Sequence, residues 1–346
     1  MVKQMNYNTS ALTRIAALAA ISVGIVVQAK AQTNVSFDAD PHATFPSRID
    51  ASGRIVGLAF HQDQTYGGFV RNTDGTIVWV NYPGALETDW LGFAAAGQIA
   101  GRYMDSAYLE HGFFGPVSGP YTRFDVAGAT QTSPVGSNSA GQIIGYWMDS
   151  ANVLHGFLRN ADGSIVTLVI PGSKTTDPED INASGQIAGV YTDQSNALHG
   201  FIRSAAGTYT TYSFPAGKTN ASVSINDAGE VAGYYYGSDY VFTGFVRDAN
   251  GTMTTFTMPG ATRTSVAQID LGGSIVGGYG GTHGLRRGYL RRPDGTTVSL
   301  EYPGANTISS TTTPTAINQS GAIVGYYQIN TTNNTVVHGF ILTGVQ

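Results

Sequence analysis

The chain has 346 residues, of which 45 are glycine and only 12% are charged, and it contains no cysteine. The lack of cysteine excludes a disulfide framework, a thiol nucleophile and a thiolate metal site, so packing and hydrogen bonding must stabilise the fold. Acids outnumber bases by 23 to 18. This net acidic balance argues against nucleic acid or an anionic lipid surface as the main partner.

The first 31 residues predict a signal peptide. Lys3 and Arg14 precede an apolar run from Ile15 to Val27, and Ala29-Lys30-Ala31 follows it as a small-x-small cleavage signature. The run has 13 residues, whereas a spanning helix needs about 20, so no membrane insertion is expected. We expect cleavage near Ala31 and a mature chain, residues 32–346, that is secreted or periplasmic.

Residues 32–346 contain one sequence motif seven times. In its fourth copy the motif reads Ile181-Asn182-Ala183-Ser184-Gly185-Gln186-Ile187-Ala188-Gly189. Successive copies are 44 residues apart, except the last two, which are 48 apart. Its first glycine recurs at Gly53, Gly97, Gly141, Gly185, Gly229, Gly273 and Gly321. Seven such units use almost all of the mature chain, so a single domain is expected.

Each unit is expected to hold four short strands separated by turns. An Asn or Asp stands three residues before the motif glycine in every unit except the second, which has Ala94; this favours a type I turn followed by a glycine at positive φ. Pairs such as Asp74-Gly75 predict two-residue hairpin turns, and pairs such as Pro171-Gly172 predict type II turns between units. The strands expected around the fourth unit are 186–191, 198–203, 208–214 and 220–225.

This pattern predicts an all-β protein, a seven-bladed β-propeller of four-stranded antiparallel blades. Residues 34–43 are similar to the last strand of a unit, yet they precede the first unit, whereas the chain ends one strand short at residues 338–342. We therefore expect the N-terminal strand, around Val35 to Phe37, to complete the last blade by pairing with residues 339–342. That pairing removes two free sheet edges.

The Gly-x-Ile-x-Gly and His-Gly-Phe strings, such as His155-Gly156-Phe157, resemble the HAF family of bacterial extracellular repeat proteins. The resemblance covers all seven units, from about Phe37 to the C-terminus. The chain departs from the family pattern by carrying Gly where the family name has Ala, and by ending units in Pro-Gly. The resemblance implies an exported propeller-like repeat protein and implies no catalytic residue.

Several polar residues recur at fixed places in the units and are interpreted as structural. The arginines that follow the Gly-Phe strands, such as Arg71 and Arg159, are expected to cover aliphatic or carboxylate surface between blades. The aspartates at one loop position are interpreted as Asx-turns rather than calcium loops: Asp105, Asp149 and Asp193. The recurring histidines each fall in a different unit, so they are expected to satisfy backbone groups rather than to bind a metal: His111, His155, His199 and His338. No cofactor and no metal are expected.

Candidate ligand-binding residues lie where the repeat is broken. Aromatic residues gather in the loops between second and third strands and near the Pro-Gly exits, which share one face around a central channel. Charges near the innermost strands are also uneven, and Arg48 is expected to face the acidic residues of the fourth unit across the axis. An ion-paired plug that only stabilises the crowded centre is the alternative interpretation. The candidates are Arg48, Asp89, Trp90, Tyr103, Trp147, Asp177, Glu179, Asp180, Tyr191, Tyr236, Arg263 and Gln268.

These observations favour a secreted, monomeric binding module for a carbohydrate or protein ligand at the aromatic-rich loop face. The alternative is a carbohydrate-active enzyme with its site at the channel mouth. Asp177 and Glu179 would then serve glycoside hydrolysis, or a Tyr with Arg48 would serve a polysaccharide lyase. A purely structural surface protein is a third hypothesis. Polar insertions in the seventh unit, 307–313 and 329–335, are either a lid over this face or neutral drift at the closure of the ring.

Overall fold

The computed structural model describes residues 32–345, apart from 64, 282–286, 303–310 and 331–334. The expected signal peptide lies outside these residues, as does most of both seventh-unit insertions. Within the described part, no helix is long and apolar enough to cross a membrane. A single 3-10 turn, η1 (Ala95–Gly97), accompanies the strands there.

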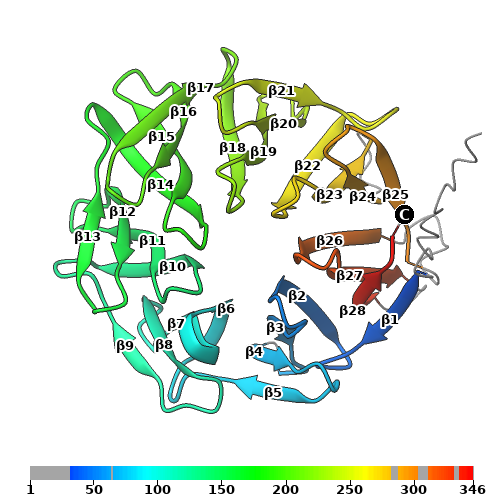
Figure 1. Cartoon of the computed structure of the whole chain (residues 1–346). Helices are drawn as coiled ribbons and strands as arrows, with labels where there is room; N and C mark the ends of the chain where they lie inside the picture. Colours follow the sequence, from blue (N-terminus) through cyan, green and yellow to red (C-terminus); the bar gives the residue numbers. More distant parts are fainter. Residues whose placement is uncertain (1–31, 64, 282–286, 303–310, 331–334, 346) are drawn as a thin grey trace, which may run out of the picture. The chain divides into compact units, whose positions relative to one another are not determined.

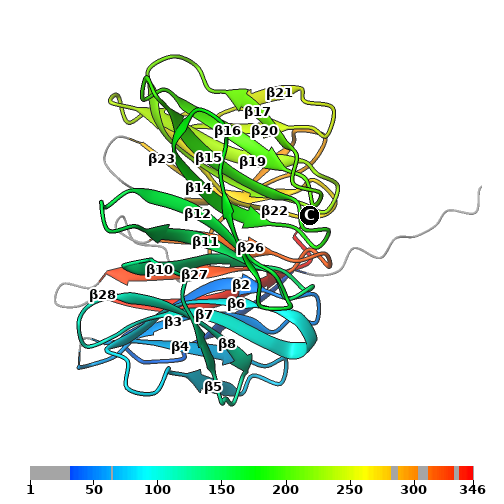
Figure 2. The ribbon, with the colours of Figure 1, turned by 90° about the vertical axis from the view of Figure 1, so that its left-hand side faces the viewer.

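The described strands form six sheets, which Figure 1 shows arranged around a central opening and Figure 2 shows turned by 90°. Five sheets each contain four antiparallel strands in chain order. Their strands are β6 (Glu87–Phe93), β7 (Gln98–Met104), β8 (Glu110–Pro116) and β9 (Thr122–Phe124); β10 (Gln131–Ser137), β11 (Ile143–Met148), β12 (Leu154–Arg159) and β13 (Ile165–Leu168); β14 (Ser173–Ile181), β15 (Ile187–Asp193), β16 (Leu198–Arg203) and β17 (Tyr209–Ser213); β18 (Lys218–Ile225), β19 (Val231–Gly237), β20 (Thr243–Arg247) and β21 (Met253–Phe256); β22 (Arg263–Ile269), β23 (Ile275–Gly280), β24 (Arg287–Arg291) and β25 (Thr297–Leu300).

The sixth sheet has eight strands and joins the two ends of the chain. Its order is β26-β27-β28-β2-β3-β4-β5, with β1 also paired to β28. The strands are β1 (Thr33–Phe37), β2 (Ala43–Ile49), β3 (Ile55–Phe60), β4 (Tyr66–Arg71), β5 (Ile77–Val80), β26 (Thr311–Ile317), β27 (Ile323–Asn330) and β28 (Thr335–Thr343).

The N-terminal strand pairs with β28 as expected from the sequence, and its register places Val35 opposite Ile341 and Phe37 opposite Gly339. The expectation that all sheets are antiparallel is wrong at one place, because Ala43 of β2 and Val337 of β28 form a parallel bridge. Only residues 38–42 separate β1 from β2. This short connection brings the start of β2 beside β28 and so fuses the first and last units into one mixed sheet.

Local turn chemistry builds each meander. In the fourth unit, Gly185 N donates to Asn182 O at 3.0 Å, and the Asn182 carboxamide oxygen accepts from Gln186 N at 2.9 Å. Gly185 has a φ of +81°, as the type I turn followed by a left-handed glycine requires.

The Asp-Gly pairs form three-residue loops and not the expected two-residue turns. Asn72 N donates to Thr76 O at 2.8 Å, and Gly75 has a φ of +91°, whereas Asp74 is not at positive φ. A two-residue type I′ turn needs positive φ at both central residues. Asp74 instead uses its carboxylate to accept from Thr76 N and Oγ1, which stabilises the type I geometry.

An aromatic ring from the third strand of each unit fills the core. The fully buried rings are Phe69, Phe113, Phe157, Phe201, Phe245, Tyr289 and Phe340. Each needs a small residue on the neighbouring second strand: a Cβ at Gly189 would lie 2.7 Å from the Phe201 ring and 2.3 Å from Asp177 O. The second glycine of the motif is therefore required by packing.

Four of the recurring arginines, Arg71, Arg159, Arg247 and Arg291, cover aromatic faces of an adjacent unit, not the expected aliphatic or carboxylate surface. The guanidinium carbon of Arg71 lies 5.0 Å from the centre of the Phe37 ring, and that of Arg159 lies 4.1 Å from the Phe114 ring. A planar guanidinium is well suited to such stacking. Burial lowers the pKa of both arginines from its ordinary value.

The pairing of β1 with β28 generates a test of stability. We expect a chain that begins at Asp38 to be less stable than one that begins at Thr33, with a free energy of unfolding lower by several kcal/mol. The reason is that β28 gains a free edge and Phe37 no longer covers Phe69 and Arg71. Urea unfolding of the two chains measures the difference. Equal midpoints would show that β1 does not stabilise the sheet.

The turn glycine generates a second test. We expect Gly185→Val to destabilise the protein by more than about 1 kcal/mol, because a branched residue is strained at positive φ. A Cβ there also lies 2.8 Å from the Gln142 side chain. Gly281→Ala is the matched control, since its added Cβ meets nothing within 4 Å and its φ is not in the strained range. Thermal melting compares the two variants, and equal melting temperatures would contradict the turn assignment.

Candidate functional site

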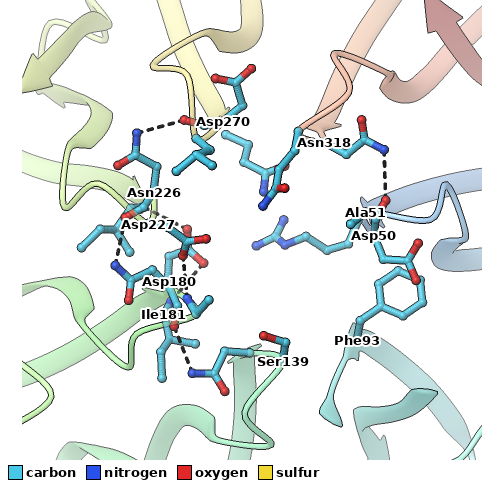
Figure 3. Close-up of a pocket in the computed structure, with 18 of the residues that line it drawn as sticks. Asp50, Ala51, Phe93, Ser139, Asp180, Ile181, Asn226, Asp227, Asp270 and Asn318 are labelled. Carbon is cyan, nitrogen blue, oxygen red and sulfur yellow. Dashed lines mark hydrogen bonds between the residues drawn. The ribbon is translucent and has the colours of Figure 1, made fainter. Parts of the chain in front are cut away.

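Two adjoining cavities occupy the centre of the ring of strands. One, of about 310 Å³, lies where the innermost strands end and the turns with the first motif glycine begin (Figure 3). It is lined by residues of β2, β6, β10, β14, β18, β22 and β26. The other, of about 470 Å³, is lined by five of these strands, β2, β14, β18, β22 and β26, and by residues of β3, β19, β23 and β27. Arg48 and Asp180 line both cavities. These two residues therefore mark the place where the cavities meet.

Arg48 is the cation of this channel. It lies on β2, is half-buried, and donates from Nη1 to Ser47 O at 3.3 Å. No ion pair in the described part of the chain joins it to a carboxylate within 4.0 Å. The ion-paired plug considered from the sequence is therefore not formed, and the guanidinium retains donors for another group.

Glu179 and Asp180 are held by the neighbouring strand β18. Glu179 Oε2 accepts from Ser222 Oγ at 2.8 Å and from Val223 N at 2.7 Å, and Asp180 Oδ2 accepts from Ser224 Oγ at 2.7 Å and from Ile225 N at 3.0 Å. Both carboxylates thus link β14 to an inner strand with which β14 has no backbone pairing. Their positions are fixed by these contacts.

A bulge in β14 explains how Glu179 reaches this position. The register shifts between Pro178 and Asp180, so Glu179 is the extra residue, and a bulge redirects the side chain that it carries. The bulge residues at this place in four other units are Ser47, Val135, Ala267 and Thr315. Only the fourth unit among these five places a carboxyl group there.

Burial changes the acidity of the carboxyl groups on β14. It raises the pKa of Asp177 to about 6 and that of Glu179 to about 8, and the negative charges of Asp177 and Asp180 add to the effect on Glu179. The hydrogen bonds from Val223 N and Ser222 act in the opposite direction. Burial thus favours the protonated form of Glu179. Asp177 lines neither channel cavity.

Gln268 lines the first cavity but is engaged in the structure. Its Oε1 accepts from Ile317 N at 3.0 Å, which links β22 to β26. The turn asparagines make equivalent links: Asn182 Nδ2, for example, donates to Asn226 O at 2.9 Å. Figure 3 shows these hydrogen bonds running around the opening. Gln268 therefore resembles the turn asparagines in role more than it resembles Arg48.

The predicted aromatic rim is mostly packed against histidines. Tyr103 is only 4% exposed and stacks on Tyr82 with ring centres 3.8 Å apart, and burial raises its pKa to about 12. Trp147 stacks on His155 and Tyr191 stacks on His199, with ring centres 4.5 and 4.9 Å apart. These three aromatic residues are better explained by packing than by ligand binding.

The histidines bind carboxylates and not the backbone groups expected from the sequence. Nε2 of His155 lies 3.0 Å from Asp149 Oδ2, and His199 makes the same contact with Asp193 at 3.1 Å. Because the other oxygen of each aspartate accepts backbone N–H groups of the loop, the Asx-turn also orients the imidazole. The described residues contain no group of three or more potential metal ligands.

Tyr236 and Arg263 belong to a separate aromatic stack at the rim. The Tyr236 ring lies 4.3 Å from Phe242 and 6.0 Å from Tyr240, and the Arg263 guanidinium lies 5.4 Å from the centre of the Phe242 ring. Tyr240 is 61% exposed and has a φ of +52°. The stack fixes the loop between β19 and β20 against the start of β22.

Asp89 belongs to a polar cluster between the second and third units. It accepts from Arg102 Nε at 2.8 Å, and Arg102 also lies 3.5 Å from Glu110 Oε2, which in turn accepts a short hydrogen bond from Ser133. These charges raise the pKa of Arg102, although its burial acts in the opposite direction. Trp90 lies on β6, and its side chain is outside the described part of the structure.

The structure does not bring the predicted residues into one site. Three of them, Asp180, Arg48 and Gln268, lie beside the turns that carry the first motif glycine, because each pairs with the second residue of the strand that follows its turn. Arg263 instead pairs with the last residue of β23, at the opposite rim. A strand of seven to nine residues is roughly 20–25 Å long. The rim aromatics and the channel charges are therefore two separate groups.

Sequence reasoning missed the aromatic walls of the larger cavity. Phe45, Tyr234 and Tyr326 line it, together with hydroxyl residues such as Ser265 and Thr313. Phe45 stands 132 residues, or three repeat lengths, before Asp177. A comparison of this repeat position across units could have identified Phe45 as an irregularity.

No protein-family model matches the chain, and no curated protein matches it. Among solved structures, the propeller domain of the Trilobed protease from Pyrococcus furiosus, described as having an open velcro topology, matches with a TM-score of 0.62 and 9% identity, over 88% of this chain and 96% of that domain. The fold is a β-propeller.

Two enzymes contain a similar propeller. A prolyl endopeptidase structure matches with a TM-score of 0.60 and 11% identity over 88% of this chain, and a puromycin hydrolase matches with a TM-score of 0.58 and 15% identity over 85%. Each match covers 51% of the other chain. At these identities the likeness shows the fold alone.

The buried carboxyl of Glu179 generates a pH-dependent prediction. A pKa raised to about 8 in the folded state means that the unfolded chain releases this proton first as the pH rises. Stability should therefore fall between about pH 4.5 and 8, by at most about 1.4 kcal/mol per pH unit for this one proton. We expect Glu179→Gln, whose amide oxygen can still accept from Val223 N, to flatten this decline.

Melting temperatures at pH 5, 6, 7 and 8 test this expectation. Glu301→Gln is the control, because this carboxylate is exposed and forms an ion pair with Arg287 at the surface. An unchanged slope in Glu179→Gln would show that Glu179 is ionised in the folded protein.

Proposed function

We propose that the protein is a secreted seven-bladed β-propeller that binds a carbohydrate in its central channel. Seven units of similar sequence and the pairing of β1 with β28 support a ring of seven blades closed by the N-terminal strand. The resemblance to HAF repeats and the expected signal peptide support export. The channel, and not the aromatic rim inferred from the sequence, is the proposed site.

The observation that carries this proposal is the pair of adjoining cavities that share Arg48 and Asp180. The larger cavity, at about 470 Å³, falls within the range of small-molecule sites, about 300–1,000 Å³. Its wall combines aromatic rings with serine and threonine hydroxyls, and Arg48 adds donors that no carboxylate of the described residues occupies. Hydroxyl groups of a sugar can exchange hydrogen bonds with such a wall, and its apolar face can lie against Phe45 or Tyr326.

A hydrolase is the second candidate, and the raised pKa values of Asp177 and Glu179 favour it. A carboxyl group that keeps its proton near neutral pH can act as a general acid. Two observations argue for binding instead. Glu179 Oε2 already accepts hydrogen bonds from Ser222 Oγ and Val223 N, and Asp177 lines neither cavity. Release of reducing ends or unsaturated uronates from a polysaccharide panel would establish the enzyme.

The binding proposal predicts that Arg48→Ala weakens sugar binding at least tenfold, since a charge-assisted hydrogen bond contributes about 1.5–3 kcal/mol. Calorimetric titration of residues 32–346 with neutral oligosaccharides and oligouronates measures the effect. Arg263→Ala is the matched control, because it removes an arginine at the opposite rim. Weaker binding in Arg263→Ala with full binding in Arg48→Ala would move the site to the rim.

A further inference from the structure

A second concave surface lies away from the channel, on the outer side of the first two units. A cavity of about 490 Å³ is lined there by Trp79, Asn81, Tyr82 and Tyr121, together with Pro83 and the loop 118–120. None of these residues is charged. A smaller cavity of about 260 Å³ shares Asn81 and Tyr82 with it and extends toward His61 and Tyr66.

Trp79 occupies a position that is polar in every other unit. It lies on the outermost strand, opposite the buried Phe69 of the third strand, and is 40% exposed. The residues with the same pairing in the other units are Ser36, Arg123, Thr167, Thr211, Thr255 and Ser299. An exposed indole is not required by the fold at a place where serine or threonine serves in five other units and arginine in the sixth.

The rings of this surface are held in place before any ligand arrives. Tyr82 stacks on Tyr103 with an interplanar angle of 3°, and the Tyr121 hydroxyl donates to Val117 O at 2.9 Å. Trp79 lies against His61, with ring centres 4.9 Å apart. His61 is in turn held by a hydrogen bond between its Nδ1 and Asp40 Oδ2, 2.8 Å apart. Rigid aromatic side chains lose little conformational entropy on binding.

Neutral hydrogen-bonding groups lie among these rings. Asn81 is exposed, and its carboxamide makes no hydrogen bond within the described part of the chain. The indole N–H of Trp79 is equally without a partner there. Ser118 lines the same cavity. Flat apolar faces beside uncharged donors and acceptors match the two surfaces of a neutral pyranose, whose ring is apolar on its faces and hydroxylated at its edge.

We propose that this outer surface, defined by Trp79, Asn81, Tyr82 and Tyr121, is a second binding site that takes an uncharged polysaccharide chain. Trp79 stacks on one sugar ring, and Asn81 hydrogen-bonds its hydroxyl groups. The neighbouring cavity at His61 and Tyr66 accepts the next ring of the chain. This site shares no residue with the channel, so it does not depend on the proposed function of Arg48.

The test is affinity electrophoresis of residues 32–346 in gels that contain xylan, mannan or a mixed-linkage glucan. We expect at least one of these neutral polymers to retard the protein, and Trp79→Ala to weaken that retardation at least tenfold. Thr167→Ala, at the same position of the third unit, should be retarded like the parent protein. Alginate and pectin, which are acidic polymers, should not retard the protein through this site.

Fluorescence gives a second measurement in the folded protein. The polymer that retards the protein should shift or quench its tryptophan emission, and Trp79→Phe should lose this signal while still binding more tightly than Trp79→Ala. Unchanged retardation in Trp79→Ala, or no retardation by any neutral polymer, would overturn the proposal. A proline-rich peptide that quenches Trp79 where the polymers do not would also overturn it and assign the surface to peptide docking.

Discussion

The carboxamide of the turn asparagine is the link on which the centre of the propeller depends. Inner strands of neighbouring sheets do not pair through their backbones, so side chains must connect them. Asn138, Asn182 and Asn226 each donate from Nδ2 to the backbone oxygen 44 residues ahead, at 2.9–3.0 Å. Asn318 closes the series by donating to Asp50 O at 3.0 Å. The oxygen of the same carboxamide accepts hydrogen bonds within its own turn, so one residue type fixes both the hairpin and the neighbouring blade.

In two units where the asparagine is replaced, another side chain makes the connection. Asp270 has no amide to donate, and Gln268 two residues earlier accepts from Ile317 N instead. The second unit has Ala94, and Ser137 Oγ donates to the adjacent Phe93 O at 2.8 Å. In both cases, a polar side chain on an inner strand makes the link that the turn asparagine makes elsewhere. The polar side chains of Gln268 and Ser137 therefore have a structural cause.

The sequence predicts the strands well because their limits depend on local chemistry. The strands expected at 198–203 and 208–214 correspond to β16 and β17, and the asparagine and glycine of each turn act within five residues. The extra residue at Glu179 is different, because a bulge is a property of the pairing between two strands. A shift of one residue reverses the face of every later side chain. The sequence therefore could not place Glu179 against Ser222 or separate Arg48 from the rim aromatics.

Irregularities of the repeat differ in what they contribute to folding. Glu179 and Asp180 are unusual in their positions, yet they accept four hydrogen bonds from β18 and so have structural partners. Trp79 has no comparable role, because its indole is 40% exposed and stands where five other units have serine or threonine and one has arginine. Stability accounts for the first irregularity and not for the second. In a protein built from equivalent units, a substitution that does not help to join the units is the stronger evidence for a ligand.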